Sequence, residues 1–171
     1  MSFQKYGMEK EERQLKLNQI QMTNSTTTFN VLIDDNESVD YNVYYVPLDL
    51  PRYRIKNLRT NSLQFEATQT DEDITKEIFE DEDSELAQKI QHSLLKKVWN
   101  EKGLYTQFKN GTKQTDALIL TSDGFVISGN RRLSSFRELY STDPQKYDHF
   151  STIKVVIVPF ENNSDKVKKI E

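Results

Sequence analysis

The chain contains no cysteine among its 171 residues. This absence excludes disulfides, thiolate metal sites and catalysis by a cysteine nucleophile. With only two histidines, the sequence also offers little material for a zinc site. No apolar run approaches the roughly 18 residues that a membrane-spanning helix needs. Met1–Ile20 lacks the apolar core of a secretory signal, so we expect a cytoplasmic protein without a membrane partner.

An excess of basic charge is also missing, because the formal net charge is -4. This balance argues against a basic surface that would hold nucleic acid over the whole protein. The charge is uneven, however, since residues 71–85 are strongly acidic while arginines and lysines gather at residues 52–59 and 131–137. A local anion site is therefore compatible with the negative total.

The length fits one domain, and eight Tyr, nine Phe and one Trp supply large side chains for one modest core. Residues 1–28 read as an N-terminal leader in which Glu9–Met22 favours a helix. Residues 29–160 form the expected domain, and residues 161–171 form a polar tail. The tail is either a frayed end or the start of a helix that leads into a C-terminal region of a longer protein.

The first half of the domain begins with two β-rich runs, Phe29–Ile33 and Tyr41–Leu48, which form a hairpin or two successive strands. We expect Arg52–Asn61 to be a polar, ordered loop and Asp71–Glu80 to be a short helix. A longer helix follows Ser84, whose side chain suits the N-cap position. The predicted inward face of that helix repeats every four residues and consists of Leu86, Ile90, Leu94 and Val98.

The second half has the clearest pattern. Ala117–Thr121 and Phe125–Ser128 predict two strands, and Ser122-Asp123-Gly124 between them is typical of a hairpin turn. Arg131–Tyr140 predicts a helix. Ile153–Val158 is an almost continuous apolar run, which indicates a central strand that is buried on both faces.

The junction Gly129-Asn130-Arg131-Arg132 is the part of this half that points to a ligand. A glycine lets the backbone turn sharply, and the N-terminus of the helix that follows favours an anion. Two arginines in a first helical turn cost a few tenths to about one kcal/mol, whereas a bound phosphate would reverse that cost. From these residues alone, a phosphate-binding loop and an ordinary turn with solvated arginines are equally good interpretations.

Two weaker candidates accompany this junction. Asn57, Arg59 and Thr60 follow a predicted strand that ends at Leu48, and α/β folds place ligands at such positions. Gln114 precedes the strand at Ala117 and carries an amide that suits a base edge or a ribose. Taken alone, the first group is better explained as a solvated basic loop and Gln114 as an exposed loop residue.

Three segments together are similar to a known family. Asp116–Leu120 followed by Asp123–Leu133 resembles the N-terminal domain of ParB, a member of the ParB/sulfiredoxin superfamily that is also described as a ParB-like nuclease domain. Asn57-Leu58-Arg59 is similar to the family's Glu-Asn-x-Arg box, and Gln114 lies where the family often has a glutamine. The resemblance covers about residues 44–159.

This resemblance implies an α/β (α+β) fold in which helices flank a small mixed β-sheet, with an acidic helical insertion at about residues 71–100. It also implies a bound nucleotide, CTP or ATP, together with Mg²⁺, and it fits a homodimer that depends on the nucleotide. Fold-level likeness does not decide activity. With Thr60 added from the loop itself, the residues that we expect at the nucleotide or its phosphates are Gly129, Asn130, Arg131, Arg132, Asn57, Arg59, Thr60 and Gln114.

The chain departs from the family pattern in ways that bear on activity. Lys56 replaces the acidic residue of the first box, and relatives use that carboxylate for a metal or for catalysis. Asn130 stands where sulfiredoxins have a cysteine, so reduction of sulfinic acids is excluded. No helix-turn-helix pattern follows the domain, so contact with DNA would need a longer parent protein. We assign no catalytic residue and no set of metal ligands.

Four functions remain open on the sequence. The leading one is a nucleotide-binding switch or NTPase in a DNA-associated protein. The others are a ParB-like nuclease, a non-catalytic interaction module with a degenerate site, and a small-molecule kinase. Lys56 stands in place of the family's acidic residue, which counts against the nuclease and the kinase. His92 lies in the helix after Ser84, and we expect a partly exposed side chain rather than a general base.

Overall fold

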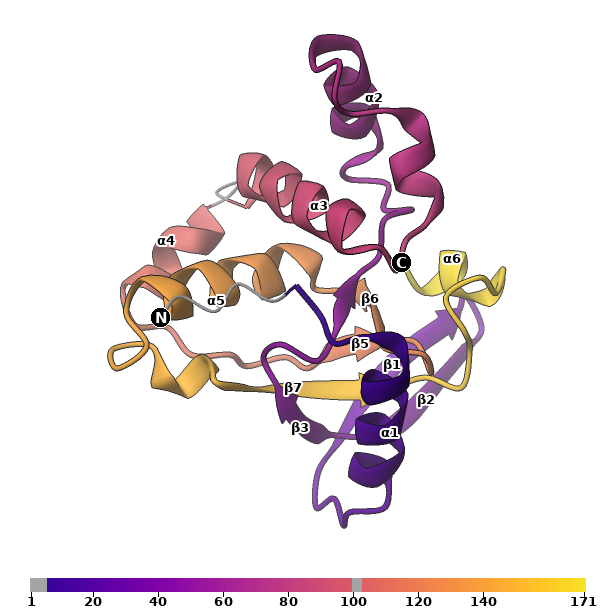
Figure 1. The fold of residues 1–171 in the computed structure, drawn as a ribbon. Coiled ribbons are helices and arrows are strands. Elements are labelled where there is room, and N and C mark those ends of the chain that lie inside the picture. Colours follow the sequence, from indigo (N-terminus) through magenta and orange to yellow (C-terminus); the bar gives the residue numbers. More distant parts are fainter. Residues whose placement is uncertain (1–5, 100–102) are drawn as a thin grey trace.

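The computed structural model describes residues 6–99 and 103–171, which form an α+β fold with two sheets (Figure 1). The main sheet has five strands in the order β3-β7-β5-β6-β4. The pairs β4–β6 and β5–β7 are parallel, while β3–β7 and β5–β6 are antiparallel, so the predicted small mixed sheet is confirmed. Its strands are β3 (Tyr44–Pro47), β4 (Arg52–Tyr53), β5 (Leu118–Leu120), β6 (Phe125–Ser128) and β7 (Thr152–Ile157).

Both faces of this sheet are covered, and the strand residues alternate between two apolar clusters. In β7, Val155 and Ile157 belong to the larger cluster, while Val156 belongs to the smaller one. Because successive side chains of a strand point to opposite faces, a strand that is buried on both sides reads as a continuous apolar run. The central, buried position predicted for Ile153–Val158 is therefore confirmed.

Helices pack with the strands in the larger cluster, and a small hairpin contributes to the smaller one. The larger cluster contains residues of α1 (Lys10–Gln21), α3 (Glu85–Val98), α4 (Leu104–Lys109) and α5 (Asn130–Thr142). Figure 1 shows α3, α4 and α5 together on one side of the main sheet. The other cluster contains residues of β1 (Thr28–Asp34) and α6 (Lys166–Ile170), and η3 (Asp148–Phe150) leads into β7.

The β-rich run predicted as one strand over Tyr41–Leu48 is divided between the two sheets. Its first part belongs to β2 (Glu37–Asn42), which pairs with β1, and its second part is β3, which pairs with β7. The chain changes sheet at Val43, whose N–H donates to the Thr27 carbonyl. Residue propensity does not encode the partner of a strand, so the single strand was a wrong prediction.

Several elements lie where no such element was predicted, among them β4 and α2. Arg52–Asn61 was expected to be a loop, but β4 occupies its start and pairs with β6 at Phe125 and Val126. α2 (Asn61–Thr70) begins at its end. The helix predicted over Asp71–Glu80 is reduced to the 3-10 helix η1 (Lys76–Glu80). Figure 1 shows α2 and η1 projecting from the body of the protein.

The helix predicted after Ser84 is α3, and its cap is confirmed because Ser84 Oγ accepts a hydrogen bond from the Ala87 N–H at 3.1 Å. Its inward face is partly wrong, since Leu86 is 52% exposed while Gln88 is buried. The Gln88 amide accepts from the Tyr53 N–H at 2.7 Å and donates to the Tyr53 carbonyl at 2.9 Å. A polar side chain is thus drawn inward because it completes the hydrogen bonds of the short edge strand β4.

His92 was expected to be partly exposed, and this is wrong because only 3% of its surface is exposed. Its Nδ1 lies 2.7 Å from the Tyr53 hydroxyl, and its Nε2 lies 3.0 Å from Glu138 Oε2. The Tyr6 ring stacks on the imidazole with centroids 4.4 Å apart. Burial lowers the pKa of His92 to about 4, although its hydrogen bond to Glu138 acts in the opposite direction.

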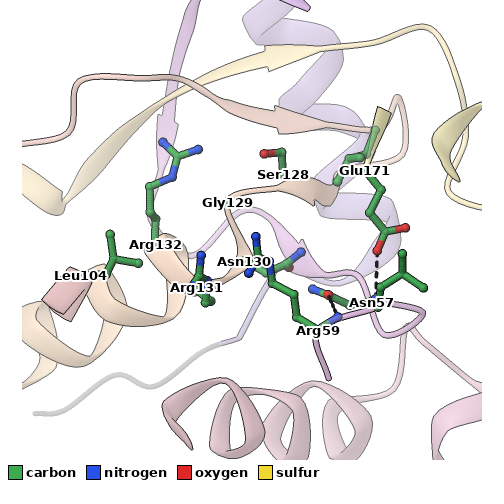
Figure 2. Close-up of a pocket in the computed structure, with 11 residues that line it drawn as sticks. Asn57, Arg59, Leu104, Ser128, Gly129, Asn130, Arg131, Arg132 and Glu171 are labelled. Atoms are coloured by element: carbon green, nitrogen blue, oxygen red, sulfur yellow. Dashed lines mark hydrogen bonds between the residues drawn. The ribbon is translucent and has the colours of Figure 1, made fainter. Parts of the chain in front are cut away.

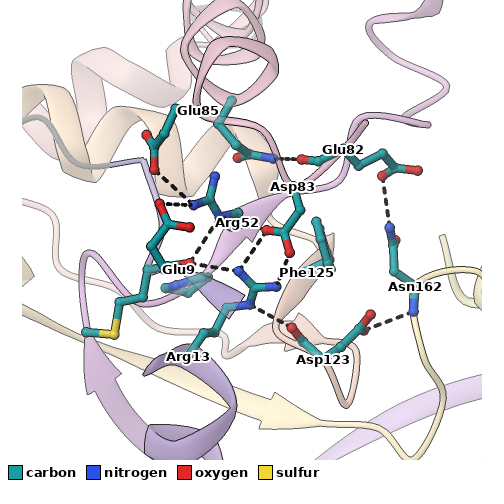
Figure 3. Close-up of polar contacts among 12 residues, drawn as sticks. Glu9, Arg13, Arg52, Glu82, Asp83, Glu85, Asp123, Phe125 and Asn162 are labelled. Atoms are coloured by element: carbon teal, nitrogen blue, oxygen red, sulfur yellow. Dashed lines mark hydrogen bonds and ion pairs between the residues drawn. The ribbon is translucent and has the colours of Figure 1, made fainter. Parts of the chain in front are cut away.

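The N-terminal helix α1 is attached to the body by a buried charge network (Figure 3). Arg13 is 1% exposed and forms two hydrogen bonds with Asp83, at 2.9 and 3.1 Å. Arg52, which is fully buried, lies 2.9 Å from both Asp83 and Glu85. Leu17 of the same helix is fully buried in the larger cluster. The leader expected at residues 1–28 therefore contributes to the core, while its residues 1–5 lie outside the described residues.

Among the helices within residues 6–99 and 103–171, none combines the length and the apolar character required to cross a membrane.

Candidate functional site

A cavity of about 440 Å³ lies between the start of α5, the loop after β4 and the C-terminal tail (Figure 2). Its volume falls within the range of small-molecule sites, about 300–1,000 Å³. The two segments predicted to act together line the same cavity, although they lie far apart in the sequence. The predicted site residues that line it are Gly129, Asn130, Arg131, Arg132, Asn57 and Arg59.

Gly129 lets the end of β6 turn directly into α5. It has φ = 110°, a left-handed conformation that side chains rarely adopt. A Cβ atom at this position would lie 2.3 Å from Leu118 Cδ2, so a larger residue would also clash with the sheet. The first helical hydrogen bond runs from the Leu133 N–H to the Gly129 carbonyl at 2.9 Å. The helix therefore begins at the cavity wall, where its dipole favours an anion.

The Asn130 side chain has a structural role at this junction. Its Nδ2 donates to the Val126 carbonyl at 2.9 Å, and its Oδ1 accepts from the Arg54 N–H at 3.3 Å. The amide thus joins β6, β4 and the helix start. The backbone N–H groups of a first helical turn have no partner within the helix, so a ligand in the cavity can use them.

Three guanidinium groups line the cavity, and one carboxylate, that of Glu171, accompanies them. Burial lowers the pKa of Arg132, and the neighbouring charge of Arg131 lowers it further, while Asp116 raises it. Arg132 Nη1 donates to the Asp116 carbonyl at 2.7 Å, which holds its side chain across the helix entrance. Because arginine stays protonated in proteins, the three arginines bring positive charge to the cavity lining, which favours an anionic ligand.

Glu171 is a component of the site that the sequence did not reveal. Its Oε1 accepts the Leu58 N–H at 3.1 Å, and its Oε2 is paired with the buried Arg54. Val167 is fully buried and attaches α6 to the smaller cluster, which carries the tail to the cavity. The tail was expected to be a frayed end or a helix start, and a polar stretch gives no signal of such a contact.

The loop after β4 is shaped by its own side chains. Asn57 Oδ1 accepts the Arg59 N–H at 2.9 Å. Thr60 is fully buried, donates to the Asn57 carbonyl at 3.3 Å and accepts from Gln91 Nε2 at 2.9 Å. Thr60 was predicted to be a site residue, but it supports the loop from behind and does not line the cavity.

Gln114 also lies outside the cavity. Its Oε1 accepts the Lys154 N–H at 2.8 Å, and its Nε2 donates to the Lys154 carbonyl at 2.9 Å. The Gln114 amide therefore pairs with the backbone of β7 as a neighbouring strand would. Besides Glu171, the lining includes four residues that were not predicted to be site residues, Leu58, Leu104, Ile127 and Ser128. Leu104 belongs to helix α4, which was also not predicted.

The donor set suits an anion better than a metal ion held by the protein alone. Within the described ranges there is no group of three or more histidine, aspartate or glutamate side chains placed to hold a metal. Glu171 is already paired with Arg54. Lys56 is exposed, and its Nζ lies 3.9 Å from Glu82.

No family model, curated protein or solved structure matches this chain.

Proposed function

We propose that the cavity binds the phosphates of a nucleotide, CTP or ATP, and that the chain is a ParB-like nucleotide-binding domain. The observation that supports this most is the meeting of Arg59, Arg131 and Arg132 at the N-terminus of α5, within one cavity of about 440 Å³. Guanidinium groups match phosphate oxygens in a forked geometry, and the helix dipole adds to the attraction.

The proposed arrangement gives each part of the ligand a partner. The phosphates would contact Arg59 and Arg131, while the absent side chain of Gly129 lets them approach the backbone. Leu58 is 74% exposed, and it lines the cavity together with Leu104. These two apolar side chains are suited to cover a base or a ribose. Mg²⁺, where it is bound, would accompany the phosphates.

We propose binding and switching rather than chemistry as the main role. Catalysis of hydrolysis or phosphate transfer needs a carboxylate or another base near the reacting group. Glu171 is the carboxylate of the cavity lining, and its two oxygens accept from Arg54 and the Leu58 N–H. This engagement, with Lys56 in place of an acid, counts against a nuclease or kinase. More broadly, we propose a cytoplasmic switch that forms a homodimer when nucleotide is bound. It would contact DNA through other parts of a longer protein.

Calorimetric titration of CTP, ATP and GTP, with and without Mg²⁺, tests this proposal. We expect CTP or ATP to bind, and we expect Arg59→Ala and Arg131→Ala each to weaken binding about tenfold or more, because a hydrogen bond to a charged group contributes about 1.5–3 kcal/mol. Lys89→Ala is the matched control, since Lys89 is exposed on α3 and does not line the cavity.

Two results would overturn the proposal. One is a folded protein that binds no nucleotide, and the other is an affinity that neither arginine variant changes. Either result would favour the interaction module with a degenerate site.

A further inference from the structure

A second hollow lies between α2 and η1, on the part of the protein that projects from the body. It is a groove of about 830 Å³. Ile55, which is 1% exposed, joins it to the body, and Phe65, on α2, is 69% exposed. The apolar side chains that line the groove are Ile55, Phe65, Ile74 and Phe79.

The walls of this groove have no core of their own. No residue of α2 or η1 is buried. A helix of ten residues is marginal in water without packing partners. Exposed apolar side chains gathered in a groove mark a surface that binds something. The walls therefore need a further apolar surface to stabilise them.

The surroundings of the groove are strongly acidic. Residues 71–85 contain nine acidic side chains and one lysine. Three of the nine, Glu82, Asp83 and Glu85, lie within 4.0 Å of basic side chains of the body. The other six form no ion pair with any residue in the described part of the chain, and they are Asp71, Glu72, Asp73, Glu77, Glu80 and Asp81.

Unpaired carboxylates around an apolar groove define the chemistry of its partner. Glu72 and Glu80 line the groove itself, beside Phe65 and Phe79. An occupant must place apolar side chains between the walls and positive charge at the rim, because complementary charges steer association and exclude wrong partners. An amphipathic helix with lysine or arginine on its polar face meets both requirements.

We propose that the α2–η1 groove docks a basic, amphipathic helical segment of another protein. Apolar side chains of that segment would contact Phe65, Ile74 and Phe79, and its basic side chains would pair with the unpaired carboxylates. The proposal goes beyond nucleotide binding and does not depend on it. The groove and the cavity are neighbours, however, since Lys56 lines the groove and Asn57 lines the cavity.

The test uses a defined probe and the whole chain. The probe is a fluorescently labelled peptide of about 14 residues, built from leucine and lysine with leucine at helical spacing. We expect saturable binding by fluorescence anisotropy, and we expect Phe65→Ser to weaken it about tenfold. Leu32→Ser is the matched control, because Leu32 is an apolar residue that is 60% exposed on the distant strand β1.

A second pair of measurements distinguishes charge-dependent binding of the peptide from nonspecific apolar binding. Replacing every lysine of the peptide by glutamate should abolish binding, and adding salt to roughly 0.5 M should weaken the basic peptide because exposed ion pairs are screened. Amide chemical shifts should change mainly over residues 61–80. The proposal is wrong if the acidic peptide binds equally well, if Phe65→Ser binds like the parent chain, or if the parent chain self-associates through Phe65 instead.

Discussion

Replacing Arg13 tests whether the N-terminal helix is part of the folded unit. Arg13→Met keeps a long apolar stem in the core but removes the guanidinium. The substitution deletes the two bonds to Asp83, the bond from Nη1 to the Met8 carbonyl at 2.8 Å and the bond from Nε to the Asp123 carbonyl at 2.8 Å. Asp83 keeps Arg52 at 2.9 Å, and the Met8 carbonyl keeps its bond from Arg52 Nε at 3.1 Å.

The magnitude follows from what remains unpaired. Removing one partner of a buried ion pair destabilises by about 3–5 kcal/mol when the other charge is left alone. Here Arg52 still neutralises Asp83, which reduces that loss. The Asp123 carbonyl loses its hydrogen-bond donor Arg13, and an unsatisfied acceptor of this kind costs about 1–3 kcal/mol of stability. We therefore expect the free energy of unfolding to fall by about 3 kcal/mol. For a chain of this length, that lowers the melting temperature by about 6–12 °C.

Urea denaturation followed by circular dichroism, together with thermal melts, measures this loss. Lys10→Met is the matched control, because it removes a positive charge from the same helix at an exposed position and should change stability by less than about 0.5 kcal/mol. Equal stability of Arg13→Met and Lys10→Met would refute this expectation. That outcome would mean that α1 does not dock through the charge network.

Two further predictions concern His92 and Glu171. Burial lowers the pKa of His92 from 6.5 to about 4, so the folded state favours the neutral ring, and the stabilisation it gives above about pH 6.5 is lost as the pH falls toward 4. Between about pH 7 and pH 4.5, the free energy of unfolding should drop by about 2 kcal/mol more in the parent chain than in His92→Gln. Urea titrations at each pH measure this drop, and an equal drop in the two proteins would contradict the prediction. Glu171→Gln removes the negative charge at the cavity and should raise ATP affinity about threefold or more in low-salt calorimetry. Asp165→Asn is the control, because the Asp165 side chain is 99% exposed, and it should leave the affinity unchanged. Equal ATP affinities of Glu171→Gln and the parent chain would show that the Glu171 charge does not oppose the ligand.

Local patterns were sufficient for the elements with strong periodicity. The hairpin of β5 and β6, the helix α5 and the buried strand β7 follow from turn residues, spacing and a continuous apolar run. These signals depend on neighbours in the sequence, so they survive without knowledge of the fold. The phosphate-loop hypothesis at Gly129–Arg132 came from the same kind of local signal, whereas the Asn57-x-Arg59 segment was linked to it by the resemblance to a known family. The structure brings both to one cavity.

Elements whose partners are distant could not be predicted in this way. β4 exists because two residues of a polar segment pair with β6, and Gln88 points inward because it completes the bonds of β4. Similarly, His92 is buried because Tyr53 and Glu138 supply its hydrogen bonds. In each case the burial of a polar group is decided by a partner that only the folded chain provides.

The sequence by itself determined the class of the protein, its strongly periodic helices and strands, and the basic segments able to meet an anion. Only the tertiary structure decided which of those segments share a cavity, and it placed Glu171 there while leaving Gln114 beside β7. It also left the acidic α2–η1 segment without a core. The physical reason is that periodicity and turn chemistry act between near neighbours, whereas cavities and buried polar pairs arise from contacts between residues far apart in the chain.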